Sequence, residues 1–229
     1  MDENSLLFKI STWLLPIMLA VVLHETAHGF VAWKLGDDTA KRQGRLTLNP
    51  IRHIDPFGTV ILPAMLLLVT GGKMSFGYAK PVPVAFWNLN NPRRDMVLVA
   101  IAGPLTNLIL AFLSAALFHI LIYLPDWSHA WLAANLSMSV FFNLILCIFN
   151  MIPVPPLDGG RVAVGILPDP LSSQVARLER AGFAIILGAL FLLPFIGDLI
   201  GRELNVFWWI VGKPALGMAR FIFSIVGVG

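Results

Sequence analysis

The sequence predicts an all-α polytopic membrane protein with about five to six transmembrane helices and a short re-entrant or extended β segment near residues 71–86. Of the 229 residues, 57% are hydrophobic and 13% are charged, whereas a soluble domain usually carries about 25% charged residues. The apolar residues gather in long runs, and a membrane-spanning helix needs roughly 20 of them. Five runs are long enough, at about 10–33, 97–124, 131–152, 181–200 and 204–226.

A sixth apolar run, Phe57 to Thr70, is too short for an ordinary span. As a helix it would rise only about 21 Å, against a hydrocarbon core of about 30 Å. Basic residues flank residues 57–86 on both sides, in the connection 34–56 and at Arg93 and Arg94. Because such residues mark the cytoplasmic side, residues 57–86 should enter and leave the membrane on that side. A re-entrant segment would do so, and a full span followed by a deep return loop is the alternative.

The connection 34–56 fixes the predicted orientation of the first span. Lys and Arg in short loops mark the cytoplasmic side of a membrane protein. This loop holds five of them: Lys34, Lys41, Arg42, Arg45 and Arg52. The first span therefore runs from outside to inside, and residues 24–28 lie in its inner half.

Residues 77–84 read Gly-Tyr-Ala-Lys-Pro-Val-Pro-Val and cannot form a regular helix. Pro81 and Pro83 force their predecessors toward extended geometry and remove two backbone donors, which confines such a strand to a sheet edge. One interpretation is a turn-rich connector. The other is an edge strand near the functional site that pairs with an unwound peptide. Its residues would be Gly77, Tyr78, Ala79, Lys80 and Val82.

The pentapeptide His24-Glu25-Thr26-Ala27-His28 lies inside the first apolar run. Ionisable side chains are costly in hydrocarbon unless a partner or water satisfies them. On a helix, His24 and His28 fall one turn apart on the same face. Both rings can then reach one zinc ion, with Glu25 beside them to accept a proton from an activated water. The motif predicts a hydrolytic metal site at membrane depth.

A catalytic zinc site needs a third protein ligand. The single cysteine, Cys147, lies within an apolar run and cannot by itself form a Cys-based site. Asp158 is the best candidate. The connection 125–130 contains no Lys or Arg and is placed outside, so the 131–152 span runs inward. Asp158 follows that span at the membrane face where the histidines are expected. Three prolines stop that span and the Gly159-Gly160 pair loosens the backbone, so the carboxylate can turn inward. A hard oxygen ligand beside two imidazoles suits zinc.

The two motifs together resemble those of the site-2 protease family of intramembrane zinc metalloproteases. The first motif is His-Glu-Thr-Ala-His, and the second is Asn-x-x-Pro-x-x-x-Leu-Asp-Gly, which begins at Asn150. Residues 77–84 and the sequence Ala-Gly-Pro-Leu-Thr-Asn at 102–107 look like the compact bacterial branch without an appended soluble domain. The resemblance extends from about residue 10 to residue 165.

The resemblance implies one Zn²⁺ per chain, bound by His24, His28 and Asp158, with Glu25 as general base. It implies that Asn150 helps to hold the substrate or the developing oxyanion. It further implies a multi-pass protein of the bacterial plasma membrane with its active site toward the cytoplasm. Such a protein would cleave a peptide bond in or near the transmembrane segment of a single-span membrane-protein substrate.

Asn107 lies within a span and has two interpretations. It could line the catalytic cavity, or it could form a helix–helix hydrogen bond, as polar side chains in membranes commonly do. The sequence alone leaves both open.

The whole chain, 1–229, is predicted to be a single integral-membrane protease domain, with a catalytic core at about 8–165 and additional transmembrane helices at about 175–229. Two alternative functions would retain the same metal site: a non-catalytic membrane adaptor and a metal-ion transporter. An adaptor would be expected to lack the base or a ligand, and a transporter to show further polar residues along its spans. The sequence meets neither expectation. Beyond the lipid bilayer and the substrate it indicates no partner: the modest net charge of +3 comes with no nucleic-acid signature, and nothing specifies an oligomer.

Overall fold

The computed structural model describes residues 5–69, 71–72 and 77–228, and helices dominate these residues. The α-helices are α1 (Leu6–Lys34), α2 (Thr39–Arg42), α3 (Leu62–Val69), α4 (Pro92–Ala116), α5 (Asp126–Asn150), α6 (Asp158–Ile166), α7 (Leu171–Arg177), α8 (Glu179–Leu187), α9 (Leu193–Leu199) and α10 (Lys213–Val226). The 3₁₀ and π segments are η1 (Pro50–His53), η2 (Pro56–Ile61), η3 (Phe86–Asn88), η4 (Leu117–Tyr123), η5 (Gly188–Leu192) and η6 (Trp208–Gly212).

Among the described residues, five helical stretches are long and apolar enough to cross a membrane. They are Leu6–Lys34, Pro92–Tyr123, Asp126–Asn150, Glu179–Leu199 and Trp208–Val226. Each coincides with one of the five apolar runs in the sequence, so the prediction of a polytopic all-α protein is confirmed. The helix over Pro56–Val69 is shorter, as expected.

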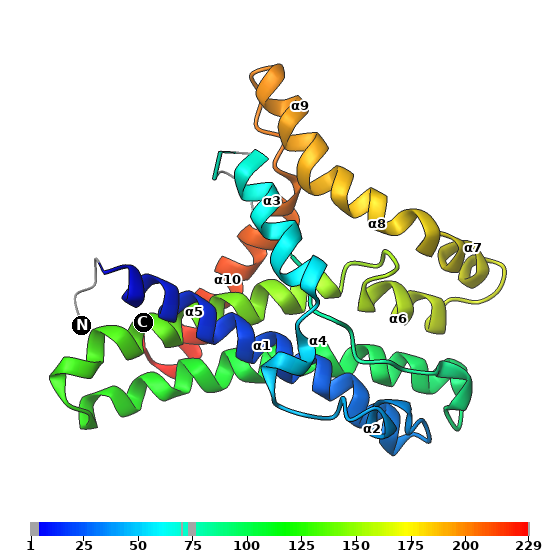
Figure 1. Cartoon of the computed structure of the whole chain (residues 1–229), viewed down its shortest axis with the longest axis horizontal. Coiled ribbons are helices and arrows are strands. Elements are labelled where there is room, and N and C mark those ends of the chain that lie inside the picture. Colours follow the sequence, from blue (N-terminus) through cyan, green and yellow to red (C-terminus); the bar gives the residue numbers. More distant parts are fainter. Residues whose placement is uncertain (1–4, 70, 73–76, 229) are drawn as a thin grey trace.

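Three long helices, α1, α4 and α5, form the body of the molecule and run side by side along its long axis (Figure 1). α6 packs against α4, and α10 packs against both α4 and α5. The helices α3 and α8–α9 project away from this body on one side (Figure 1). The body therefore holds the first motif, on α1, next to the start of α6, where the second motif ends.

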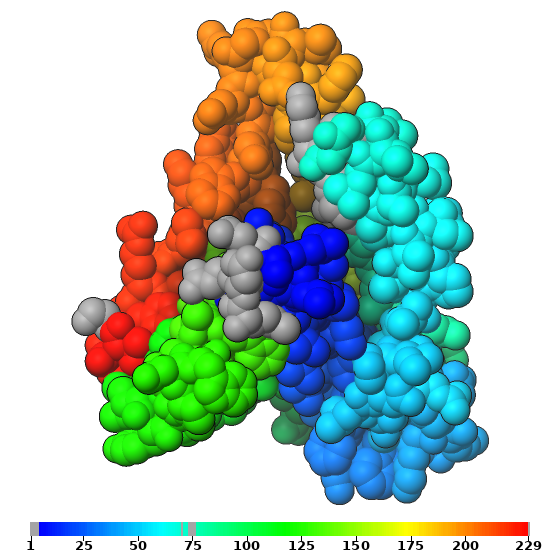
Figure 2. Space-filling model, turned by 60° about the vertical axis from the view of Figure 1, so that its left-hand side comes forward, coloured from blue at the N-terminus to red at the C-terminus, as the bar shows by residue number. Residues whose placement is uncertain are grey.

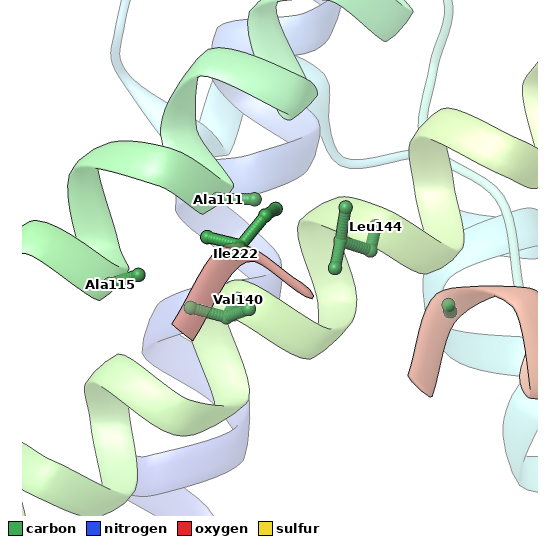
Figure 3. Close-up of a cluster of buried hydrophobic side chains, with 6 residues drawn as sticks. Ala111, Ala115, Val140, Leu144 and Ile222 are labelled. Atoms are coloured by element: carbon green, nitrogen blue, oxygen red, sulfur yellow. The ribbon is translucent and has the colours of Figure 1, made fainter. Parts of the chain in front are cut away.

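The core between α4, α5 and α10 is built from small and branched apolar side chains (Figure 3). Three alanines let the helix backbones approach closely, as small residues do at membrane helix interfaces. Branched side chains fill the remaining space. The buried members are Ala111, Ala115, Val140, Leu144, Ala215 and Ile222.

The segment from η2 to residue 80 leaves the helical body and returns to its own starting point. The Tyr78 amide donates to the Gly58 carbonyl at 3.0 Å, and the Lys80 amide donates to the His53 carbonyl at 2.9 Å. The Tyr78 ring occupies the space that a Cβ atom on Gly58 would need. Entry and exit therefore lie side by side, as both alternatives for residues 57–86 require.

Residues 77–85 are non-helical, as Pro81 and Pro83 dictate. However, no strand is assigned anywhere in the described part of the chain, so the expected β segment is an extended chain without a partner strand. Its amides bond singly to carbonyls of η1 and η2 and to the side chains of Glu25 and Asp37. The prolines leave too few donors for a continuous ladder within this chain. Residues 73–76 of the expected segment lie outside the described residues.

Candidate metal centre

Three side chains from the two sequence motifs converge inside the helical body. The Nε2 atoms of His24 and His28, one turn apart on α1, lie 3.0 Å from each other. The Oδ2 atom of Asp158 lies 3.2 Å from the His24 Nε2 and 3.3 Å from the His28 Nε2. All three residues are buried. The structure thus brings together the three residues that the sequence singles out as ligands.

The spacing of these three atoms suits a single metal ion. Zinc ligands at 2.0–2.1 Å in a tetrahedral site stand about 3.3 Å from one another, and the three edges here measure 3.0 to 3.3 Å. Asp158 Oδ2 is buried and has no hydrogen-bond partner among the described residues. A buried carboxylate oxygen without a donor is costly. A cation held between this oxygen and two ring nitrogens would remove that cost.

The outer nitrogens of both rings are held by oxygen atoms of the neighbouring helix α4. His24 Nδ1 lies 2.6 Å from Asn107 Oδ1, and His28 Nδ1 lies 2.7 Å from the Val99 carbonyl oxygen. Because these oxygens accept, each Nδ1 carries the proton and each Nε2 presents its lone pair to the centre. Histidine ligands are typically oriented in this way by a partner on the second nitrogen.

Gly103 makes room for the two rings where α1 and α4 meet. A Cβ atom at this position would lie within 2.6 Å of the Nε2 atoms of both histidines. Real Cβ atoms essentially never approach other atoms so closely. The centre therefore requires a residue without a side chain at position 103 of α4.

Asp158 reaches the histidines because the chain turns back sharply after α5. Pro153, Pro155 and Pro156 follow the end of that helix, and α6 begins at Asp158. Cβ atoms on the next two residues, Gly159 and Gly160, would overlap the backbone of Met151 and of Pro155 respectively. The glycine pair thus lets the start of α6 fold onto the preceding turn, and this aims Asp158 at α1.

A cavity of about 460 Å³ opens beside the three ligand atoms. Its walls come from α1, the segment 77–84, the end of α5, the start of α6, and α8. In the space-filling view, α3 (cyan) and α8–α9 (gold to orange) stand apart, with a recess between them (Figure 2). Of the residues singled out from the sequence, His24, Glu25, His28, Gly77, Tyr78, Ala79, Val82, Asn150 and Asp158 line this cavity.

Glu25 lies in this cavity and is tied to the extended segment. The Val82 amide donates to Glu25 Oε2 at 2.8 Å. Pro81 and Pro83 have no amide hydrogen, so Val82 supplies the one donor among these three residues. The carboxylate is consequently held in the same cavity as the two histidines and Asp158, with one oxygen engaged.

The two asparagines expected near the site occupy different places. Asn150 lines the cavity, and its Nδ2 atom donates to the Leu146 carbonyl at 3.0 Å. Asn107 is fully buried behind His24 and does not line the cavity. The structure therefore supports an interhelical hydrogen-bonding role for Asn107, directed at His24.

Lys80 and several residues that the sequence did not indicate complete the surroundings. Lys80 does not line the cavity; its amide and carbonyl bond to His53 and Arg45. Phe183 and Ile186 of α8 and Arg161 of α6 do line it. Nothing local in the sequence marks these three as neighbours of the site. Asn143, whose Oδ1 atom accepts a hydrogen bond from Asn107, also belongs to these surroundings. It is a polar residue within a span, and that signal could have marked it as a residue of interest.

Asp37, just beyond α1, anchors the far end of the extended segment. Its carboxylate accepts hydrogen bonds from the Ala85 amide at 2.7 Å and from the amide and hydroxyl of Thr39. Burial alone would raise the pKa of Asp37, but these bonds and one from Asn88 outweigh burial and lower the pKa below its ordinary value. The carboxylate is therefore charged at neutral pH and holds residue 85 in place.

Two histidines, an aspartate and a glutamate in a cavity between apolar helices define the class of membrane-embedded metallopeptidases. The sequence matches Peptidase family M50 over residues 12–126 and 119–193. The chain therefore belongs to peptidase family M50, the site-2 protease family, and the resemblance drawn from the two motifs is confirmed.

Relatives from bacteria and archaea agree with this assignment. The candidate zinc metalloprotease YwhC of Bacillus subtilis is 43% identical over 198 residues, which cover 83% of this chain and 84% of YwhC. The candidate zinc metalloprotease Rip2 of Mycobacterium tuberculosis is 34% identical, covering 88% of this chain and 71% of Rip2. MJ0611 of Methanocaldococcus jannaschii, similarly named, is 31% identical, covering 69% of this chain and 70% of MJ0611. No solved structure matches the chain.

Proposed function

We propose that this protein is an intramembrane zinc endopeptidase that hydrolyses a peptide bond in or near a transmembrane segment of a membrane-protein substrate. One observation carries the proposal. Three buried ligand atoms meet within 3.3 Å of one another, directly beside Glu25 and at the wall of a cavity. Membership of family M50 and relatives named as candidate zinc metalloproteases support the choice of reaction and of metal.

One Zn²⁺ per chain would be held by His24, His28 and Asp158, whose donor set of two imidazoles and a carboxylate suits this ion. When bound, zinc supplies Lewis-acid activation of a water molecule and of the scissile carbonyl. The protein's own contribution is to hold the three donors in place: bonds from α4 orient both rings, and the tight turn at Gly159 and Gly160 positions Asp158.

Glu25 would act as the general base. Its carboxylate would take a proton from the attacking water and then deliver that proton to the leaving amine. Because Val82 engages one carboxylate oxygen, the other is available for this transfer. Asn150 would stabilise the oxyanion, since an amide nitrogen carries two hydrogens and only one is used by the Leu146 carbonyl.

The substrate would be a single-span membrane protein with a locally unwound helix, because helical peptide bonds are masked. In the segment 77–84, Tyr78 and Lys80 direct both their amides and their carbonyls into the protein. Successive backbone groups of an extended chain point in opposite directions. The outward groups of this edge would therefore be the amides of Gly77 and Ala79 and the carbonyls of Gly77, Ala79, Pro81 and Pro83. Such an edge mainly accepts, so the substrate would supply most of the donors.

The cavity would open toward the cytoplasm. The histidines lie in the half of α1 that ends at Lys34, and the connection after it carries four further Lys and Arg residues before position 53. Basic loops of this kind remain on the cytoplasmic side. Water would reach the site from that face.

The decisive test compares the purified protein with two variants. Glu25→Gln should retain one zinc per chain and lose cleavage of single-span substrates, whereas Glu203→Gln makes the same chemical change at an exposed position away from the cavity and should remain active. Mass spectrometry of the products, with and without a zinc chelator, reads the cleavage position. Full activity of Glu25→Gln would remove this residue from the mechanism. Zinc uptake into liposomes without peptide cleavage would favour a transporter instead.

A further inference from the structure

Behind His24 lies a chain of buried amide groups that links three helices. Asn107 Nδ2, on α4, donates to the Ala20 carbonyl of α1 at 3.1 Å and to Asn143 Oδ1 of α5 at 2.8 Å. Asn143 Nδ2 in turn donates to the Ser139 carbonyl at 2.8 Å. Asn107 and Asn143 are both essentially inaccessible to solvent. Water therefore does not compete for these bonds.

The direction of every bond in this chain is fixed by two backbone carbonyls, which can only accept. The Ser139 carbonyl requires the nitrogen of Asn143 on its side, so the Asn143 oxygen must face Asn107. That oxygen and the Ala20 carbonyl both require the nitrogen of Asn107. The Asn107 oxygen is thereby left facing His24 Nδ1, which must carry the proton. His24 Nε2 then presents a lone pair to His28 and Asp158.

We propose that Asn143, which touches neither the metal ligands nor the cavity, is a positioning residue for the metal centre. Through Asn107 it selects the His24 tautomer that can bind a metal through Nε2. The inference rests on the metal site of the proposed function. If the Asn143 oxygen is removed, the Asn107 amide loses one of the two acceptors that hold its orientation. A rotated amide would place its nitrogen against His24 Nδ1 and disfavour the binding tautomer.

A purely structural role is the alternative, because buried asparagines commonly join membrane helices. The two roles differ in what they change. Loss of helix–helix adhesion lowers the temperature of unfolding but leaves the affinity of the folded protein for zinc unchanged. Loss of tautomer control lowers zinc affinity, since removal of an outer partner of a histidine ligand typically costs 10–100-fold.

The test measures zinc affinity by competition with a chromophoric chelator in detergent, alongside thermal unfolding. Asn143→Leu should weaken zinc binding by about tenfold, the lower end of the range for outer partners. Asn135→Leu is the matched control: it lies two turns away on α5, and its Nδ2 makes the same kind of bond, to the Trp131 carbonyl at 2.9 Å. This control should leave zinc affinity unchanged.

A second background makes the test specific to tautomer selection. Asn107→Asp replaces the amide with a carboxylate, whose oxygens can only accept, so it holds the proton on His24 Nδ1 whatever Asn143 does. In that background Asn143→Leu should no longer weaken zinc binding. The inference would be overturned if Asn143→Leu weakened zinc binding equally in the unmodified and the Asn107→Asp proteins. It would also be overturned if Asn143→Leu alone left zinc affinity unchanged. Absence of stoichiometric zinc in the unmodified protein would instead refute the proposed function.

Discussion

Gly103→Ala is the substitution that most directly tests whether His24 and His28 hold a metal ion together. The added methyl carbon would lie within 2.6 Å of the Nε2 atoms of both His24 and His28. Zinc binds imidazole nitrogen at about 2.0–2.1 Å, so the methyl group would intrude on the volume that the ion requires. Both rings would have to swing away, and the set of three ligands would be lost.

The magnitudes separate metal binding from folding. Alanine is a better helix former than glycine by about 1 kcal/mol in a helix interior, while overpacking of a tight interior costs roughly 1–3 kcal/mol. The net destabilisation of α4 should therefore be at most about 2 kcal/mol. Zinc affinity should fall more than about 100-fold, because displacement of two ligands exceeds the loss of one outer partner.

The assay is chelator competition for zinc, with thermal unfolding measured on the same samples. Gly217→Ala on α10 is the matched control, because a Cβ atom there would meet open space. That variant should bind zinc normally and unfold at the same or a slightly higher temperature. If Gly103→Ala bound zinc as tightly as the unmodified protein, the two rings could not form the centre described above.

Three further predictions concern the surroundings of the site. Val82→Pro removes the amide that donates to Glu25 and should lower kcat roughly tenfold, the value of one hydrogen bond of about 1.4 kcal/mol, with zinc content unchanged; Val82→Ala keeps the amide and should lose less. Asp37→Asn should lower the unfolding temperature. Because the pKa of Asp37 lies below its ordinary 3.8, the gap in unfolding temperature between the unmodified protein and Asp37→Asn should stay constant from pH 8 to 5 and narrow only below about pH 4. A gap that closes between pH 8 and 5 would contradict a charged Asp37 at neutral pH. Chelation should abolish cleavage reversibly while circular dichroism shows unchanged helix content, since the core of α4, α5 and α10 contains no ligand.

The fold was predictable because its strongest signal is hydrophobic length. Each apolar run long enough to span a bilayer became one long helical stretch, interrupted only by 3₁₀ or π turns. The extended segment 77–85 was predictable as non-helical from its prolines. The hydrogen bonds of this segment were not predictable, because the acceptors come from His53 in η1, Gly58 in η2 and Glu25 on α1. Such partners depend on packing rather than on local sequence.

For the site, residue type and spacing were sufficient to single out the three candidate ligands that the structure brings together, but not the groups that support them. Histidines one turn apart must share a helix face, and an aspartate after a proline-rich break can turn toward them. The sequence left Asn107 between two roles, since an asparagine within a span serves either purpose. Asn143 was recognisable only as a polar residue within a span. Neither its role nor that of the Val99 carbonyl could be assigned, because both roles follow from the way α4 and α5 pack against α1.

Both imidazoles take their orientation from a single neighbour, α4, through one side-chain oxygen and one main-chain oxygen. A slight slide or rotation of α1 against α4 would therefore misalign both imidazole rings at once. Occupancy by zinc should therefore report faithfully on whether the bundle has assembled in its correct register. A chain inserted into the membrane but wrongly packed would therefore hold no zinc and cut no peptide bond.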